Sequence, residues 1–243
     1  VWGGEFGRTP MNEARGGSIR LLSTNGGDIA AVNQSGFNLL QVNALAGRSA
    51  GGTDATGGDI EVVADGGSIS FAADTQLVTN GVTGGDRALG FLATGRGGNI
   101  LLRTGADSGS NINFSNGLFA GADGRADLGN ESNTFASGTG GNVIAEIQGG
   151  SFSAGSAEFR ASGFGSAAEA GAGAATGTGG TAIFVQTGGL ATFGDLAVRA
   201  DGIGGTGSVQ AEGGDGIGGT ATINLLGGTI DAGQISAAAS GTG

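Results

Sequence analysis

The sequence contains no cysteine, no histidine, no tyrosine and no lysine, and it has a single proline among its 243 residues. Without thiols and imidazoles, the chain cannot form disulfides, metal sites that need those ligands, or nucleophilic pairs such as Ser/His and Cys/His. The printed sequence has no apolar run of about 18 residues, and its first residues lack the basic and apolar regions of a signal peptide. We therefore expect neither a membrane-spanning helix nor a signal peptide within it.

Glycine and acidic residues dominate what is present. The chain has 58 glycines, 38% hydrophobic residues and only 5% aromatic residues, so its core must consist mainly of small and aliphatic side chains. Glycine does not occupy every third position, which excludes collagen. Twenty-one acids against ten arginines give a net charge of −11, which repels nucleic-acid phosphates and anionic lipid headgroups. We expect no nucleic-acid partner and no direct insertion into a membrane.

A Gly-Gly pair followed by a small or polar residue and an apolar residue recurs six times, at intervals of 39 to 43 residues. The six pairs are Gly16-Gly17, Gly57-Gly58, Gly97-Gly98, Gly140-Gly141, Gly179-Gly180 and Gly218-Gly219. A second, similar turn follows each pair, then a third apolar stretch such as residues 157–161, and a glycine-rich segment closes the unit. We expect positive φ angles at the paired glycines, because glycine adopts them without steric cost.

The apolar stretches alternate with period two and are too short for helices, so they are predicted to be strands. Each stretch best resembles its counterpart one unit later, which favours parallel stacking of units. The prediction is an all-β, right-handed parallel β-helix solenoid of about six coils, each with about 40 residues, three short strands and a long glycine-rich loop. Six coils would make a rod about 29 Å long. Residues 1–15 are interpreted as a cap or foreign segment, and residues 16–243 as repeats with a truncated last unit.

Counting along the predicted strands places the side chains of successive units in columns. Four columns face the core, and all 24 of their positions are apolar. The first strand supplies Ile19, Ile60, Ile100, Val143, Ala182 and Ala221, then Leu21, Val62, Leu102, Ala145, Phe184 and Ile223. The second strand supplies Ile29, Ile69, Ile112, Phe152, Ala191 and Ile230, then Ala31, Phe71, Phe114, Ala154, Phe193 and Ala232. On the outer surface, Arg20 is expected beside Glu61, and Arg103 beside Glu146.

Two stretches resemble known families. Residues 57–69 (GGDIEVVADGGSI) and 97–102 (GGNILL) resemble repeats of filamentous-haemagglutinin-like exoproteins and autotransporter passengers of Gram-negative bacteria. This resemblance covers residues 16–243 and implies a β-helical stalk or adhesive rod at the outer surface. Residues 2–13 resemble a segment of uncharacterised sulfatase-like proteins of the alkaline-phosphatase superfamily. That family continues into an Asp-His stretch that is missing here, so the resemblance carries over neither a metal site nor an activity.

Acidic residues in or beside the glycine-rich loops are the candidates for chemistry. They are Asp54, Asp86, Asp123, Asp127, Glu131, Glu169, Asp201, Glu212 and Asp215. They do not fall in a common column of the predicted coil, so we assign no catalytic, cofactor-binding or metal-binding residue.

An outward apolar stripe is the best candidate for a binding surface. Leu101, Ile144 and Ile183 form one outward column, and Val63 and Val185 lie two positions further along the same strand. An exposed stripe of this kind marks a contact site unless the long glycine-rich loops fold over it.

These observations favour an extracellular structural or adhesive rod, a fragment of a larger secreted or surface-anchored protein without catalysis or cofactors. Its partner would be a glycan or protein on a host or neighbouring cell surface. Two alternatives stay open. One is a filament subunit that self-associates end to end, and the other is a carbohydrate-active β-helix enzyme that uses loop carboxylates.

Overall fold

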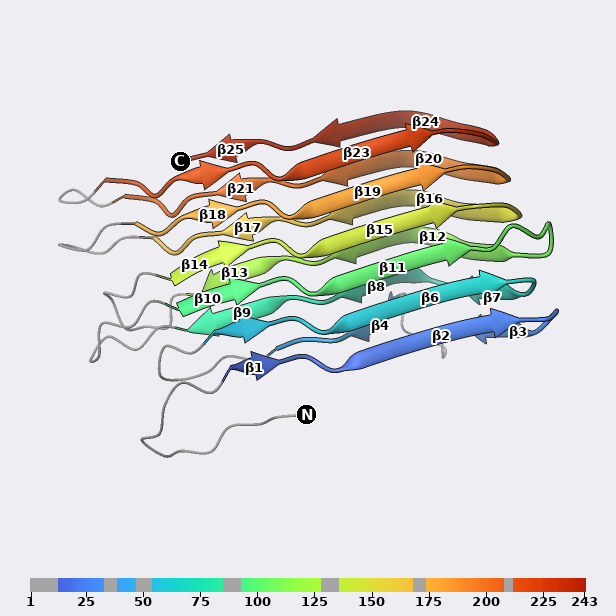
Figure 1. Cartoon of the computed structure of the whole chain (residues 1–243), viewed down its shortest axis with the longest axis horizontal. Helices are drawn as coiled ribbons and strands as arrows, with labels where there is room; N and C mark the ends of the chain where they lie inside the picture. Colours follow the sequence, from blue (N-terminus) through green and yellow to red (C-terminus); the bar gives the residue numbers. More distant parts are fainter. Residues whose placement is uncertain are drawn as a thin grey trace.

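The computed structural model describes residues 13–32, 39–46, 54–84, 93–127, 136–167, 174–207 and 212–243. Within these residues all regular secondary structure is β-strand, and the strands form four parallel sheets, here called A to D (Figure 1). The chain visits the sheets in the same order in every turn of a solenoid. The predicted all-β parallel solenoid is therefore confirmed.

The strands of each sheet lie next to each other along the solenoid axis. Sheet A contains β1 (Ala14–Arg15), β5 (Ala55–Thr56), β10 (Ala93–Arg96), β14 (Ala136–Thr139), β18 (Gly177–Thr178) and β22 (Gly216–Ile217). Sheet B contains β2 (Ser18–Thr24), β6 (Asp59–Asp65), β11 (Asn99–Thr104), β15 (Asn142–Ile147), β19 (Thr181–Gln186) and β23 (Thr220–Leu225).

Sheets C and D form the return path of each turn. Sheet C contains β3 (Asp28–Ala31), β4 (Leu39–Asn43), β7 (Ser68–Phe71), β8 (Asp74–Val78), β12 (Asn111–Gly121), β16 (Ser151–Arg160), β20 (Leu190–Arg199) and β24 (Thr229–Ala238). Sheet D contains β9 (Gly81–Gly84), β13 (Gly124–Asp127), β17 (Gly163–Phe164), β21 (Gly202–Ile203) and β25 (Gly241–Thr242).

The solenoid is right-handed. In Figure 1, sheets A and B at the front run to the right, sheets C and D behind them run to the left, and the chain climbs from β1 to β25. This is the hand that right-twisted parallel strands prefer in their crossovers. We number the passes as rungs 1 to 6, which begin at β1, β5, β10, β14, β18 and β22. Five turns separate the first and last strands of sheet A, and rung 6 contributes strands to all four sheets.

The number of strands in each turn differs from the prediction. The predicted second and third strands are one long strand in β12, β16, β20 and β24, and β12 bends where its register with β16 shifts between Phe114 and Gly117. The glycine-rich segment, predicted to be a loop, contributes sheets A and D. Their strands are as short as two residues, and they pair through backbone atoms of glycine, so they leave no alternation of apolar side chains in the sequence.

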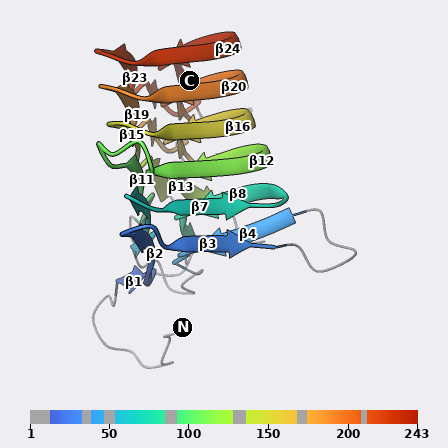
Figure 2. The same cartoon turned by 90° about the vertical axis from the view of Figure 1, so that its right-hand side faces the viewer.

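The core follows the predicted columns. The strand registers of sheets B and C place all four inward columns as expected, including the neighbours Ala182 and Phe184. Phenylalanine rings stack through the middle rungs, and Figure 2 shows from the side how the rungs lie one above another. The Phe71 and Phe114 rings are 4.7 Å apart at 6°, and Phe152 follows at 5.7 Å from Phe114. The core is therefore a continuous column of apolar side chains parallel to the solenoid axis.

The paired glycines are needed for two different reasons. The turn between sheets B and C has positive φ at Gly26, Gly66, Gly150, Gly189 and Gly228, as expected. The pairs that precede sheet B have no positive φ, so the expectation was wrong for them. At Gly141, a Cβ would instead overlap the carbonyl oxygen of Gly98 one rung below. In rungs 2 to 6 these glycines are required because the backbones of neighbouring rungs approach closely, not because of their φ angles.

Candidate functional site

The predicted apolar stripe lies on the outer face of sheet B. The register pairs Leu101 with Ile144 and Ile144 with Ile183, and all three side chains are half-buried. Val185 lies beside Glu146 in the neighbouring column and is half-buried as well. Val63 differs from the prediction, because only 1% of it is exposed.

Val63 is flanked in its column by two longer side chains, Leu22 in rung 1 and Arg103 in rung 3. Its buried surface cannot contact a partner, so the accessible stripe is shorter than predicted. Val185 also lines a shallow depression of about 410 Å³ at the end of sheet B. The other residues that line this depression are Ala106, Glu146, Ile147, Gln148 and Thr187.

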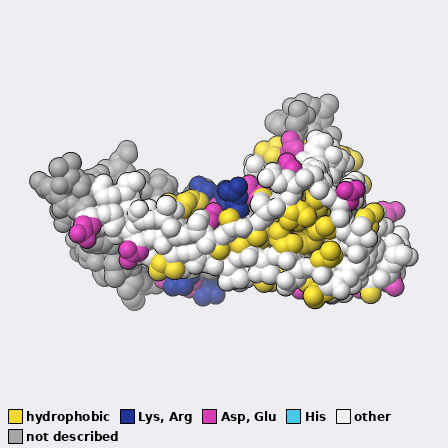
Figure 3. Space-filling view, turned by 90° about the horizontal axis from the view of Figure 1, so that it is seen from above, with side chains coloured by type: hydrophobic (Ala, Val, Ile, Leu, Met, Phe, Trp, Pro, Cys, Tyr) yellow, Lys and Arg dark blue, Asp and Glu magenta, His cyan; other side chains and the backbone are white. Residues whose placement is uncertain are grey.

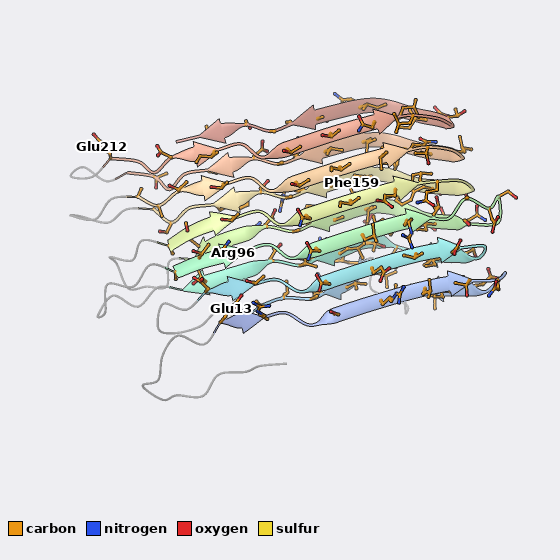
Figure 4. The ribbon with its side chains drawn as sticks, viewed as in Figure 1. Glu13, Arg96, Phe159 and Glu212 are labelled. Atoms are coloured by element: carbon orange, nitrogen blue, oxygen red, sulfur yellow. The ribbon has the colours of Figure 1, made fainter. Side chains whose placement is uncertain are left out.

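The candidate acids are placed in several environments. Asp54 accepts a hydrogen bond from the Thr94 backbone N–H at 2.8 Å, and Asp215 is exposed. Glu212 is exposed between β21 and β22, at one end of the cross-section (Figure 4). Asp127 is the last residue of β13. Asp86, Glu131 and Glu169 lie outside the described residues.

Asp123 and Asp201 share a column at the corner between sheets C and D, contrary to the prediction that the acids do not align. The column is Asn80, Asp123, Ser162, Asp201 and Ser240. Each side chain accepts a hydrogen bond from the backbone N–H of the next member, at 2.9 Å from Asp123 to Asn80 and 3.1 Å from Ser162 to Asp123. In the sequence, this column is marked by a polar residue that precedes a glycine of sheet D in each unit. In any single unit such a pair looks like an ordinary turn.

Asp123 is the centre of an ion-pair cluster that joins sheets C and D. Its side chain is fully buried. Arg160 on β16 binds it through two nitrogens, with Nη2 at 2.6 Å and Nε at 3.1 Å from Oδ2, and Arg125 on β13 places Nη2 at 3.2 Å. Burial acts to lower the pKa of Arg160, but hydrogen bonds and attraction to Asp123 outweigh it and raise that pKa above its ordinary value. Arg160 is therefore a permanent cation in this corner.

Two aromatic rings support these arginines. The Arg160 guanidinium lies over the Phe119 ring at 4.6 Å, and Arg125 lies over Phe164 at 4.8 Å. Arg125 and Arg160 thus extend from two sheets towards one carboxylate at this corner. Figure 3 shows a group of arginine side chains in a hollow of the outline.

We call this surface the corner notch. Its residues are Phe119, Asp123, Arg125, Glu158, Arg160, Phe164 and Arg199. Three arginines face three acids at this corner, because the charge of Asp201 in the same column also acts on Arg160. Sequence reasoning missed the notch, because its arginines lie on different strands and meet only through the bend between sheets C and D. Its arginines are held by the buried carboxylate and by the two rings, so the cluster fastens sheet C to sheet D.

Replacing Asp123 with asparagine is expected to lower the free energy of unfolding by about 2 to 3 kcal/mol, because two cations then lose a buried partner. This is less than a fully enclosed pair would lose, since Arg160 and Arg125 are 24% and 45% exposed and can turn towards water. Denaturant unfolding measures the change. The control Asp231→Asn, at an exposed position, should change stability by less than about 0.5 kcal/mol. Equal effects of the two variants would contradict the structural role of the cluster.

Within the described ranges, no three carboxylates lie close enough together to hold a metal ion. The same residues contain no helix with the length and hydrophobicity needed to cross a membrane. Comparison with protein-family models, with curated proteins and with solved structures finds no match to the chain.

Proposed function

We propose that this chain is a rod-forming segment of a structural or adhesive protein that acts outside the cell. The observation that carries the proposal is the unbroken register of sheet B, in which each strand pairs residue by residue with the next from rung 1 to rung 6. Such a stack transmits its geometry along one axis, and each rung contacts only its neighbours. Length can then change by whole rungs without a change of cross-section.

The composition and the side-chain ladders support this role. Without cysteine, an exported chain cannot be trapped by wrong disulfides. Side-chain ladders on the surface reinforce the stack, as where Asn142 donates to Asn99 at 2.8 Å and Asn99 donates to Asp59 at 2.7 Å. An enzyme that uses loop carboxylates is less well supported, because Asp123, the acid nearest the arginines, is buried and bound to two of them.

Deleting one rung tests the proposal. Removal of residues 179–217 takes out β19 to β22 and joins the end of β18 to the segment that leads into β23. The shortened chain should stay folded, and the rod should lose about 4.8 Å of length by small-angle scattering. Attachment of the purified chain to cells should be retained. The result that would contradict the proposal is an enzymatic turnover in the natural chain that the deletion abolishes.

A matched control distinguishes rung deletion from simple shortening. Removal of residues 190–217 takes out β20 to β22 and joins the segment after β19 directly to the segment that leads into β23. Both of these strands belong to sheet B. This deletion removes fewer residues than the first one, but it leaves β19 without the sheet C, D and A strands that normally follow it. The chain then no longer passes through the four sheets in order. It should lose the β-sheet circular dichroism signal or aggregate, whereas the in-phase deletion should not.

A further inference from the structure

One glycine of the solenoid has no structural reason within the described part of the chain. In rungs 2 to 6, the second glycine before sheet B is required because its Cβ would overlap the carbonyl oxygen of its counterpart one rung below. Gly17 is the first member of this column, and its φ is not positive. A Cβ added there meets none of the described residues within 4 Å. A rung stacked beneath Gly17 would require glycine there, as it does in the five rungs above.

The backbone in this column is complementary at the two ends of the solenoid. From Asp59 to Thr220, the N–H that follows the second glycine donates to the carbonyl of the second glycine one rung below, at 2.8 to 3.0 Å in all five steps. Within the described residues, the carbonyl of Gly219 accepts no such bond and the Ser18 N–H donates none. The top of rung 6 thus presents an acceptor, and the bottom of rung 1 presents the donor that fits it.

The apolar core reaches the surface at rung 6. Inward side chains of rung 5 are buried, such as Phe184 at 0% and Leu196 at 1% exposed. Their register partners in rung 6 are Ile223, which is half-buried, and Ile235, which is 46% exposed. Figure 3 looks at this end of the solenoid and shows hydrophobic side chains gathered on it. Terminal rungs that face water carry polar caps in repeat proteins, so this apolar face is suited to receive another rung.

The inward side chains of the two ends match when rung 1 is placed on rung 6 in the register of the solenoid. Ala221 shares a column with Ile19. Ala237 shares a column with Val42. Small side chains of rung 6 would therefore meet larger ones of rung 1, as in the core within the chain, where Ala182 lies beneath none but small or aliphatic partners of its column.

The outward side chains of sheets B and C are compatible with the same placement. Asp28 would lie over Thr229, whose hydroxyl can donate to it as the Ser68 hydroxyl does from rung 2. Asp231 would lie beneath Ala30. Along the described strands of these two sheets, the placement brings no like charges together.

We infer that rung 1 of one copy of this chain stacks on rung 6 of a second copy, in the same parallel register as consecutive rungs within the chain. Ser18 of one copy would donate its backbone N–H to the Gly219 carbonyl of the other, and the inward columns would continue across the junction. The occupant is a second copy because it supplies the same cross-section, the same glycine column and the donor that Gly219 lacks. Since the two contacting surfaces differ, each copy keeps one open end, and the association is a linear stack rather than a closed dimer.

The first test measures the mass of the whole chain in solution by light scattering over a range of concentrations. The natural chain should form species larger than a dimer. Gly17→Ala should weaken the association at least about tenfold, because its Cβ would overlap the Gly219 oxygen of the other copy. The matched control is Gly109→Ala in the turn of rung 3, where φ is not positive and an added Cβ has only an ordinary contact at 3.9 Å. It should associate like the natural chain.

Two variants that block opposite ends show which surfaces meet. Gly17→Ala blocks rung 1, and Ile235→Asp places a carboxylate on the apolar face of rung 6. Each variant alone should be monomeric, and their equimolar mixture should form a 1:1 pair and nothing larger. Circular dichroism confirms folding, and if Ile235→Asp does not fold, Leu225→Asp, at a side chain that is 52% exposed, takes its place.

Charge opposes the association and gives a further test. Each chain carries −11, and the junction brings Glu13 over Asp215 at the edge of sheet A. Raising the salt concentration from about 0.01 M to about 0.15 M shortens the screening length from about 30 Å to about 8 Å, so it should strengthen the association. Asp215→Asn should strengthen it several-fold. Asp231→Asn changes the net charge equally but lies beneath Ala30, so it should have a smaller effect.

The inference is overturned if the natural chain stays monomeric at all concentrations, if Gly17→Ala associates like Gly109→Ala, or if Gly17→Ala forms a dimer on its own, which would mean that rung 6 meets rung 6. It goes beyond the proposed rod, which needs only the stack within one chain. The chain without residues 179–217 keeps both ends and should associate like the natural chain. If both stay folded and monomeric, the stacking of copies is rejected and the rod is left intact.

Discussion

Gly141→Ala is expected to prevent folding, with a loss of about 4 kcal/mol or more. The new Cβ would overlap the Gly98 carbonyl oxygen and lie 2.5 Å from the carbonyl carbon of Gly97, where real Cβ contacts are essentially never under 3.0 Å. These are backbone atoms of the rung below, so no side-chain rotation relieves the clash. The two rungs would have to separate, which stretches the 2.9 Å hydrogen bond from Asn142 N–H to the same oxygen.

Gly17→Ala is the matched control for this variant. Gly17 occupies the same column in rung 1, where an added Cβ meets nothing within 4 Å, and its φ is not positive. Alanine there should be neutral or slightly stabilising, because it reduces the freedom of the unfolded chain. Circular dichroism and size-exclusion chromatography measure the outcome. If Gly141→Ala folded as well as Gly17→Ala, that result would contradict the close backbone approach of neighbouring rungs between sheets A and B.

Phe152→Ala is expected to lower the free energy of unfolding by about 3 to 5 kcal/mol, the range for a fully buried phenylalanine. The Phe152 ring is 0% exposed and contacts two other rings, Phe114 and Phe193, each at 5.7 Å. Its removal would leave a cavity in the middle of the core. The rungs cannot close over this cavity, because their spacing is fixed by backbone hydrogen bonds.

Leu190→Ala is the control for the core variant. Leu190 lies on the neighbouring rung with its side chain directed outward, and it is 45% exposed. Its truncation should cost less than about 1 kcal/mol, since little surface returns to water. Denaturant unfolding measures both changes. The free energy of unfolding of the two variants should fall with denaturant concentration at the same slope. Comparable losses for the two variants would show that Phe152 does not lie in a packed core.

The sequence was sufficient to predict the features that depend on side-chain alternation. Inward columns such as Ile60 and Ile100 repeat with the unit, so parallel stacking and its register could be predicted before the structure. Sheets A and D could not be predicted from the sequence, because strands such as Gly177–Thr178 are held by backbone pairing and bury almost no side chain. Val63 shows a related limit, since its outward direction was predicted but its burial depends on its neighbours in adjacent rungs.

The corner notch required knowledge of shape in addition to register. The recurrence of a polar residue before the sheet D glycine was visible at Asp123 and Ser162, yet each looked like a turn residue when taken alone. That Arg125 and Arg160 meet at Asp123 follows from the bend between sheets C and D, which no local pattern encodes. That Ser162 occupies in the next rung the place of Asp123 can be recognised only when that geometry is known.

In the solenoid each strand residue of sheet B pairs with its counterpart one rung later. The natural chain has no cysteine, so an engineered pair reports its own proximity. Asn99 and Asn142 are exposed register partners, and Asn142 pairs in turn with Thr181.

Oxidative cross-linking tests this pairing most directly. Asn99→Cys with Asn142→Cys should form a disulfide under mild oxidation, because partners in neighbouring rungs are about 4.8 Å apart. Asn99→Cys with Thr181→Cys spans two rungs, roughly 10 Å, and should form none within the monomer. Formation of the second disulfide in place of the first would contradict the solenoid.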